Sequence, residues 1–356
     1  MASIILTSDD RINDYFVGVS FGGDSISSAK LLIDRVKAYT NLFVIQSGPA
    51  SKNETLLNEI CDYAVDAELS IIVYFGKFDL DWQPLWLDKV KDRWGSKFLG
   101  IYFFDEPAGS LLDAIDEMWN ISLGPIPNNY NEMAEYFVDS WRSMPGLITV
   151  KNRLSSPVAF TSDYALYWFD YLAGYDVVLT QFGWNHSRVQ DIALIRGAAR
   201  LQNKEWGTIV TWTFDESPYL EDGEKMYEDL MLAYNNGAKY FVVFNYPEIN
   251  EYGILTDEHF LAIERFWNKI QDGSEYSPVV ADSVLVLPKN YGYGMRRIDD
   301  TIWGLWKADE KSFQIWDISR KLLNDYGTKL DIVYEDSNFT LKSNYSRIFY
   351  WNSTIY

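Results

Sequence analysis

The sequence has 356 residues, which is enough for one domain of barrel size followed by a small second domain. Its 31 Lys and Arg residues stand against 51 Asp and Glu residues. The resulting net charge of -20 would repel nucleic acid and anionic membrane surfaces, so neither is expected as a partner. No apolar run approaches the roughly 18 residues that a membrane-spanning helix needs.

Strands and helices alternate regularly from residue 15 to about residue 270. The predicted strands are 15–21, 42–46, 70–75, 98–104, 157–161, 177–182, 208–214 and 240–244. The main predicted helices are 25–39, 54–67, 84–94, 111–119, 130–143, 189–201 and 256–270. This pattern predicts a (β/α)8 TIM barrel over residues 1–272, because a doubly wound open sheet seldom runs to eight uninterrupted repeats. The long connection at about 110–156 is predicted to be an insertion that shapes a cleft.

A second pattern of elements follows in residues 279–356. Strands are predicted at 283–288, 330–334 and 347–351, with a helix at 313–326. This predicts a small Rossmann-like α/β domain. The loop that begins at Asn290 contains Gly-x-Gly but lacks the third glycine and a helix directly after it, so no dinucleotide site is expected.

Cysteine and histidine are too scarce to carry the chemistry. Cys61 is the single cysteine, and its place in a helical apolar pattern predicts a core position. His186 and His259 are the two histidines, so a multi-histidine metal site is not expected, and no Gly-x-Ser-x-Gly motif is present. Carboxylates therefore remain as the catalytic candidates, with no metal or cofactor predicted.

The most informative stretch is the fourth predicted strand, an apolar run that ends in Asp105, Glu106 and Pro107. Acids at the carboxyl end of a buried parallel strand lie where TIM barrels place their active sites. The seventh predicted strand likewise ends in Asp215 and Glu216. Two carboxyls on different strands can supply the proton donor and the second carboxylate that cleavage of a glycosidic bond requires. In both pairs the alternative is that the acids only cap the following helix.

Asp105-Glu106-Pro107 resembles the Asn-Glu-Pro that ends strand four in the large clan of retaining (β/α)8 glycoside hydrolases. The resemblance implies that Glu106 is the acid/base and that Glu216 is the nucleophile. Asp105 stands where that clan has an Asn that contacts the sugar. Asp215 stays open as the second carboxylate, because a shift of one residue changes which side chain faces inward.

We therefore expect a glycoside hydrolase that cleaves an oligo- or polysaccharide by a two-carboxylate, retaining mechanism. An aromatic content of 17% favours flat platforms for sugar rings. The residues expected to bind substrate are the polar and aromatic side chains at the strand ends together with one Trp of the second domain that could fold over the cleft: Gln46, Tyr74, Lys77, Gln181, Trp184, His186, Trp212, Asn245, Tyr246 and Trp303.

Two other functions fit the same pattern. A non-catalytic carbohydrate-binding barrel would keep the aromatic residues without turnover. A surface-layer or scaffold protein would have its strand-end carboxylates paired with Lys or Arg. Arg196 and Arg200, one helical turn apart, are predicted to pair with acids on a helix surface rather than to bind a ligand.

Six Asn-x-Ser/Thr sequons begin at Asn53, Asn120, Asn185, Asn338, Asn344 and Asn352. Together they predict a secreted or cell-surface glycoprotein. The residues at the start of the chain lack the basic region and the length of a signal peptide, so an exported protein would have lost its signal from this chain.

Overall fold

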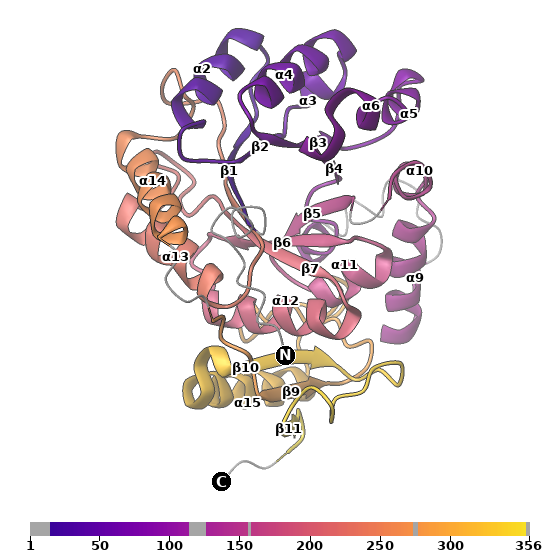
Figure 1. The fold of residues 1–356 in the computed structure, drawn as a ribbon. Helices are drawn as coiled ribbons and strands as arrows, with labels where there is room; N and C mark the ends of the chain where they lie inside the picture. The colour runs from indigo at the N-terminus through magenta and orange to yellow at the C-terminus, as the bar shows by residue number, and fades with distance from the viewer. Residues whose placement is uncertain (1–14, 114–125, 156–157, 273–276, 354–356) are drawn as a thin grey trace, which may run out of the picture.

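The computed structural model describes residues 15–113, 126–155, 158–272 and 277–353. Eight parallel strands close into a barrel in chain order, and the last strand pairs with the first (Figure 1). These strands are β1 (Phe16–Phe21), β2 (Leu42–Ile45), β3 (Ser70–Phe75), β4 (Phe98–Phe103), β5 (Ala159–Asp163), β6 (Val177–Phe182), β7 (Glu205–Val210) and β8 (Tyr240–Val243). The predicted (β/α)8 barrel is confirmed.

Helices connect the strands on the outside of the barrel. They are α2 (Ile26–Val36), α3 (Gly48–Ser51), α4 (Glu54–Asp66), α5 (Trp82–Leu87), α6 (Val90–Trp94), α7 (Gly109–Asp113), α9 (Tyr130–Arg142), α10 (Pro145–Arg153), α11 (Tyr167–Ala173), α12 (Arg188–Gln202), α13 (Gly223–Asn235) and α14 (Asp257–Gln271). Polar side chains start many of them, as Asn53 does by accepting a hydrogen bond from the backbone of Leu56. Residues 114–119 of the predicted helix 111–119 lie outside the described residues. Within the described segments, no helix is long and apolar enough to cross a membrane.

The inside of the barrel is filled by alternate residues of its strands, which form a buried cluster of their own. Leu42 and Val44 of β2 belong to this cluster, as do Val177 and Leu179 of β6. Side chains two residues apart on a strand share a face, so these columns lead to Gln46 and Gln181 at the carboxyl ends. Cys61 is buried in the layer between the strands and the helices, as predicted.

Strand β7 runs from Glu205 to Val210 and not over the predicted residues 208–214, so it both begins and ends earlier than predicted. The backbone N–H groups of Thr213 and Phe214 both donate to the carbonyl of Tyr219, at 2.7 and 3.0 Å. These groups therefore close a local turn instead of continuing the ladder with a neighbouring strand. Asp215 and Glu216 lie on this turn, beyond the end of the strand.

The second domain is a three-stranded parallel sheet in the order β10-β9-β11, formed by β9 (Ser283–Leu287), β10 (Leu330–Tyr334) and β11 (Arg347–Tyr350), with α15 (Glu310–Tyr326) between β9 and β10. It packs against α12 of the barrel, as Figure 1 shows in yellow. Arg196 of α12 forms a 2.8 Å ion pair with Asp331 of β10. The predicted pairing of Arg196 with an acid is confirmed, but the pair is buried between the domains rather than exposed on a helix surface.

Candidate active site

The tip of β4 has a strained backbone. Phe104 and Glu106 have φ values of 59° and 53°, in the left-handed region that residues other than glycine seldom adopt. The backbone N–H of Glu106 donates to the carbonyl of Ser162 on β5, at 3.0 Å, and this bond helps to hold the conformation. Strain of this kind gathers at functional sites, where surrounding contacts stabilise it.

The Glu106 carboxyl group is half-buried beside the end of β6, where its Oε1 accepts a 2.6 Å hydrogen bond from the Gln181 side-chain amide. Burial, followed by the negative charge of Asp105, raises the pKa of Glu106 to about 7. The hydrogen bond from Gln181 acts in the opposite direction. Near neutral pH the group is therefore divided between its acid and base forms, which suits a group that must donate and accept a proton.

Asp105 is held by neutral donors. The Tyr102 hydroxyl donates to its Oδ1, the Ser162 hydroxyl donates to the same oxygen at 3.0 Å, and the Gln46 amide lies 3.5 Å from Oδ2. Burial raises the pKa of Asp105, while the bonds from Tyr102 and Ser162 oppose that rise. The scaffold hypothesis predicts that these acids pair with Lys or Arg, and among the ion pairs of the described part of the chain none involves Asp105 or Glu106.

Asp163 at the end of β5 anchors the loop that follows Glu106. Its buried carboxylate accepts backbone N–H bonds from Ala108 at 2.7 Å and from Gly109 at 2.9 Å, and two more from the residues that follow it. The free N–H groups at the start of α7 are therefore bound by Asp163. The alternative that Asp105 and Glu106 cap the following helix is therefore disfavoured, because the backbone N–H groups of Ala108 and Gly109 already donate to Asp163.

Aromatic side chains lie at the ends of β6, β7 and β8. Trp184 is 40% exposed and Tyr246 is 45% exposed, values that are large for side chains of this size. The half-buried Trp212 stands between them in sequence, and its ring centroid is 6.4 Å from that of Tyr246. Trp184 has a φ of 50° and its N–H donates to the carbonyl of Trp212, which ties the β6 and β7 tips together. Tyr74 of β3 lies against Tyr102, with centroids 5.7 Å apart.

His186 is neutral at physiological pH. Burial, followed by the charges of Arg296 and Arg188, lowers its pKa to about 4. Arg188 also donates to the carbonyls of Gly183 and His186, at 2.8 and 3.0 Å, which fixes the loop after β6. His186 therefore carries no positive charge near neutral pH.

Asn245 and Trp303, which are predicted to bind substrate, are both buried and hydrogen-bonded within the protein. The Asn245 amide donates to the carbonyl of Tyr252 at 2.7 Å and accepts from the N–H of Ile254 at 3.0 Å, so it is used to hold its own loop. Trp303 is fully buried, and its indole N–H donates to the carbonyl of Asn290. It packs on Phe169 and Phe137 between the second domain and the barrel helices, where a sugar cannot reach it.

The candidates for the second carboxylate and the predicted Lys77 lie on the surface. Asp215 and Glu216 are exposed on the turn after β7, and Lys77 is exposed after β3. In the described residues no hydrogen bond or ion pair joins Asp215 or Glu216 to Glu106. The structure does not choose between these two carboxylates.

Sequence reasoning missed Tyr102 and Ser162, the two hydroxyl groups that hold Asp105. Tyr102 belongs to the interior cluster with Phe160, which precedes Ser162 by two residues on β5. A count of inward-facing positions along β4 and β5 could have found both, because the strand period is two residues.

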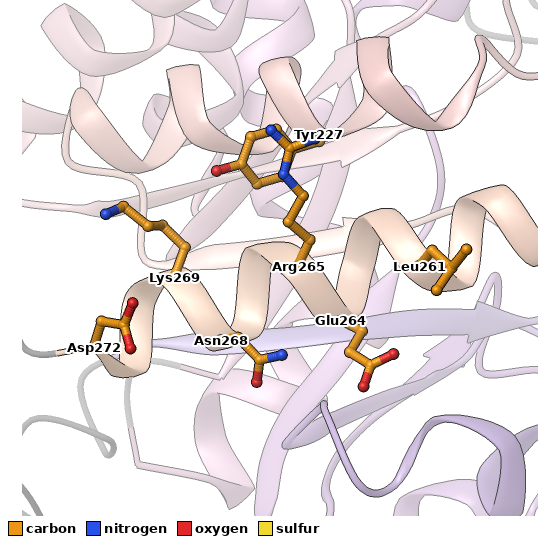
Figure 2. Close-up of a pocket in the computed structure, with 7 residues that line it drawn as sticks. All are labelled: Tyr227, Leu261, Glu264, Arg265, Asn268, Lys269 and Asp272. Atoms are coloured by element: carbon orange, nitrogen blue, oxygen red, sulfur yellow. The ribbon is translucent and has the colours of Figure 1, made fainter.

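A surface hollow of about 460 Å³ lies on α14 and involves Tyr227 of α13 (Figure 2). Arg265 stacks on the Tyr227 ring at 3.7 Å and pairs with Glu224. The residues that line this hollow come from the outer helical layer, so it is separate from the strand ends. No cluster of three or more metal-ligating side chains occurs in the segments that the structure covers.

No family model and no curated protein matches this chain by sequence. Among solved structures, the chain is similar to the GH5_18 protein of Streptomyces cattleya in complex with GlcNAc, with a TM-score of 0.56 and 12% identity over 94% of this chain and 99% of that one. It is similar to a β-galactosidase of Halorubrum lacusprofundi, with a TM-score of 0.61 and 11% identity over 94% and 69% of the two chains. It is also similar to an α-L-fucosidase of Paenibacillus thiaminolyticus, with a TM-score of 0.58 and 11% identity over 94% and 59%.

These structural neighbours are glycoside hydrolases built on a (β/α)8 barrel. At identities of 11 and 12% the likeness establishes the shared fold, and it extends over 94% of this chain in all three cases. Fold alone does not fix function, so the functional argument rests on the site itself.

Proposed function

We propose that this protein is a glycoside hydrolase that acts on an oligo- or polysaccharide, with Glu106 as its general acid. One observation carries the proposal: the Glu106 carboxyl is held at a strained strand tip, at the barrel mouth, with a pKa raised to about 7. A carboxylic acid that keeps its proton near neutral pH can donate it to a leaving glycosidic oxygen. The glycoside hydrolases among the structural neighbours support the same class of reaction.

We further propose a retaining mechanism. A second carboxylate, Glu216 or Asp215, attacks the anomeric carbon and forms a glycosyl ester while Glu106 gives its proton to the leaving alcohol. The Glu106 carboxylate then takes a proton from water, the water oxygen bonds to the anomeric carbon, and the ester bond breaks to release the second carboxylate. This sequence requires the two carboxyls about 5–5.5 Å apart, whereas an inverting enzyme separates them by roughly 6.5–9.5 Å.

Sugar recognition would combine aromatic faces with unused amide oxygens. Trp184, Tyr246 and the half-buried Trp212 offer flat apolar faces at the ends of β6 to β8. The side-chain oxygens of Gln46 and Gln181 are buried and have no hydrogen-bond partner among the residues that the structure describes. A buried acceptor without a partner costs free energy, and a sugar hydroxyl can supply the missing donor.

The experiment compares the wild-type protein with Glu106→Gln on a panel of aryl glycosides and plant, fungal and bacterial glycans. We expect turnover of at least one substrate and a loss of about 10²–10⁴-fold in kcat in the variant, the range that general acid catalysis contributes. Affinity for the same ligands, measured by calorimetry, should change little. Wild-type-like turnover by the folded variant would remove Glu106 from the role of acid.

The exposed position of Asp215 and Glu216 favours one other function, a carbohydrate-binding barrel without turnover, because no hydrogen bond or ion pair in the described residues holds either carboxylate toward Glu106. Glu216→Ala and Asp215→Ala with added azide separate the cases. The nucleophile variant should lose activity, and azide should restore turnover as a glycosyl azide of inverted configuration. Binding of glycans by a wild-type protein that hydrolyses none of them would establish the binding function instead.

We also propose that the protein is exported and glycosylated. The sequon asparagines Asn53, Asn185, Asn338 and Asn352 are exposed and so accessible to glycosylation. Protein purified from its own source should lose mass on treatment with an N-glycanase. An unchanged mass would contradict glycosylation.

A further inference from the structure

A loop of the second domain contacts α7, the helix that follows the Glu106 loop. The loop lies between β9 and α15 and carries Arg296, whose guanidinium forms a 2.6 Å ion pair with Asp113 at the end of α7. Thr301 of the same loop is 3.4 Å from the carbonyl of Leu112, the preceding residue of α7. Residues of the second domain therefore bind α7, the helix that follows the Glu106 loop, through an ion pair and a hydrogen bond.

Arg296 is fixed before it reaches the barrel. Its Nε and Nη2 donate to the two carboxylate oxygens of Asp300, at 2.9 and 2.8 Å, and the backbone N–H of Arg296 donates to the same carboxylate. Asp300 is fully buried, and the Arg296 side chain is 10% exposed. Such a two-point ion pair orients the guanidinium, so its remaining amino group points to Asp113 without further ordering.

A continuous set of contacts leads from Arg296 to the Glu106 loop. Asp113 accepts a 2.7 Å hydrogen bond from the Tyr164 hydroxyl, and Arg296 lies over the Tyr164 ring at 5.4 Å. The Tyr164 ring packs so tightly on Gly109 that a Cβ atom there would come within 2.4 Å of it. Gly109 donates its N–H to Asp163. It is the first residue of α7 and follows Glu106 closely in the chain.

The titratable groups around Glu106 are aspartates and tyrosines. The titratable groups that face it are Asp105 and Tyr102 from β4, Asp113 from α7, and Asp163 and Tyr164 from the end of β5. Arg296 is the cation that forms an ion pair with a member of this group in the described residues. Burial acts against ionisation of Asp113, but the bonds from Arg296 and Tyr164 prevail and hold its pKa below the ordinary value. The ionised Asp113 in turn raises the pKa of Glu106.

We propose that Arg296 is a positioning residue of the active site: acting through Asp113 and Tyr164, it fixes the Glu106 loop and offsets the charge of Asp113. The small domain is then part of the catalytic unit and not an appended module. This inference rests on the proposed role of Glu106 as an acid, but it makes a claim about the carboxyl group that can be measured without any substrate.

The test follows the Glu106 carboxyl carbon by NMR through a pH titration of the full chain labelled at glutamate carboxyls, with Glu106→Gln used to assign the signal. Arg296→Met removes the charge that offsets Asp113, so the pKa of Glu106 should rise by about half a unit to one unit. Arg296→Lys should restore part of the difference. The matched control is Arg347→Met, which breaks another ion pair of the second domain, with Asp282, and should leave the titration unchanged.

Asp113→Asn gives a second measurement with the opposite sign, because it removes a negative charge near Glu106 and should lower its pKa. It decides the matter if Arg296→Met does not fold. An unchanged Glu106 titration in the folded variants would overturn the proposal. A shifted titration in a protein that hydrolyses no glycan would uphold the role of Arg296 in positioning this loop and would place the failure on the proposed function instead.

Discussion

The two sides of the barrel mouth are built differently. On the side of β4, β5 and β6, the carboxyls of Asp105, Glu106 and Asp163 are partly or fully buried and bound by neighbouring donors. On the side of β7, Asp215 and Glu216 are exposed on a turn that closes on its own backbone. The first side sets the protonation state of its groups before any ligand arrives, whereas the second leaves its carboxylates in solvent.

This difference shows that the protonation state of an acid at a strand end depends on its burial and on its hydrogen-bond partners. The sequence places an acidic pair after each of the two strands. Burial raises the pKa of both carboxyls after β4, whereas the two acids after β7 are exposed.

Asp163→Asn should cost about 3 kcal/mol in the free energy of unfolding, because an amide N–H₂ would then face backbone N–H groups that now donate to the two carboxyl oxygens. Asp215→Asn on the opposite side is the matched control and should change stability by less than about 0.5 kcal/mol. Urea unfolding followed by circular dichroism measures both. Equal losses of unfolding free energy in Asp163→Asn and Asp215→Asn would show that the two sides do not differ in their contribution to stability.

The rate should depend on pH through Glu106. Because the acid form is the active one and its pKa is about 7, kcat/KM should fall above that pH. The decline should reach about tenfold per pH unit. The linked stability has the same sign: a raised carboxyl pKa stabilises the fold at low pH, and this contribution is lost as pH rises through about 7. A flat alkaline limb up to pH 9 would show that Glu106 does not act as the acid.

Ser162→Ala removes the hydroxyl that bonds to Asp105 and lies 3.0 Å from the Gln181 amide. We expect a loss of about tenfold in kcat, corresponding to roughly 1.4 kcal/mol, with KM little changed. Ser217→Ala on the exposed turn is the control and should retain full activity. A change confined to KM would indicate that Ser162 acts in binding and not in holding Asp105.

Trp184→Ala should raise KM or Kd for an oligosaccharide by about five- to tenfold, the effect of losing about 1 kcal/mol of contact with a sugar face. Leu85→Ala, which also removes an exposed apolar side chain but lies on α5, is the control. Titration with a soluble glycan that the wild type binds measures both variants. If Trp184→Ala binds the glycan as tightly as the wild type does, the sugar does not stack on Trp184 and binds at another part of the barrel mouth.

The fold was predictable because the period of strands and helices is a local property. The apolar runs of β4 and β6 each predict a buried strand without knowledge of their neighbours. The end of β7 was not predictable in this way, since Thr213 and Phe214 have strand-like neighbours and the bonds to Tyr219 decide the outcome.

The candidate site was predictable only in part, for the same physical reason. Gln46 and Gln181 follow from the alternation of inward positions, and the structure brings both to the carboxyls of β4. The burial of Trp303 and the approach of Arg296 to Asp113 depend on how the second domain docks. Contacts between segments so distant in the chain leave no periodic signal in a single sequence.

The docking of β10 on α12 has a consequence for how the molecule unfolds. Gly197 of α12 lies so close to β10 that a Cβ atom there would meet the carbonyl of Ile332 at 2.9 Å, and the Arg196–Asp331 pair is sealed in the same contact. Helix α12 thus packs against both the barrel and the sheet of the second domain. Separating either sheet from α12 would expose the buried side chains of this helix to solvent. The barrel and the small domain should therefore unfold together in a single cooperative transition, although they differ in topology.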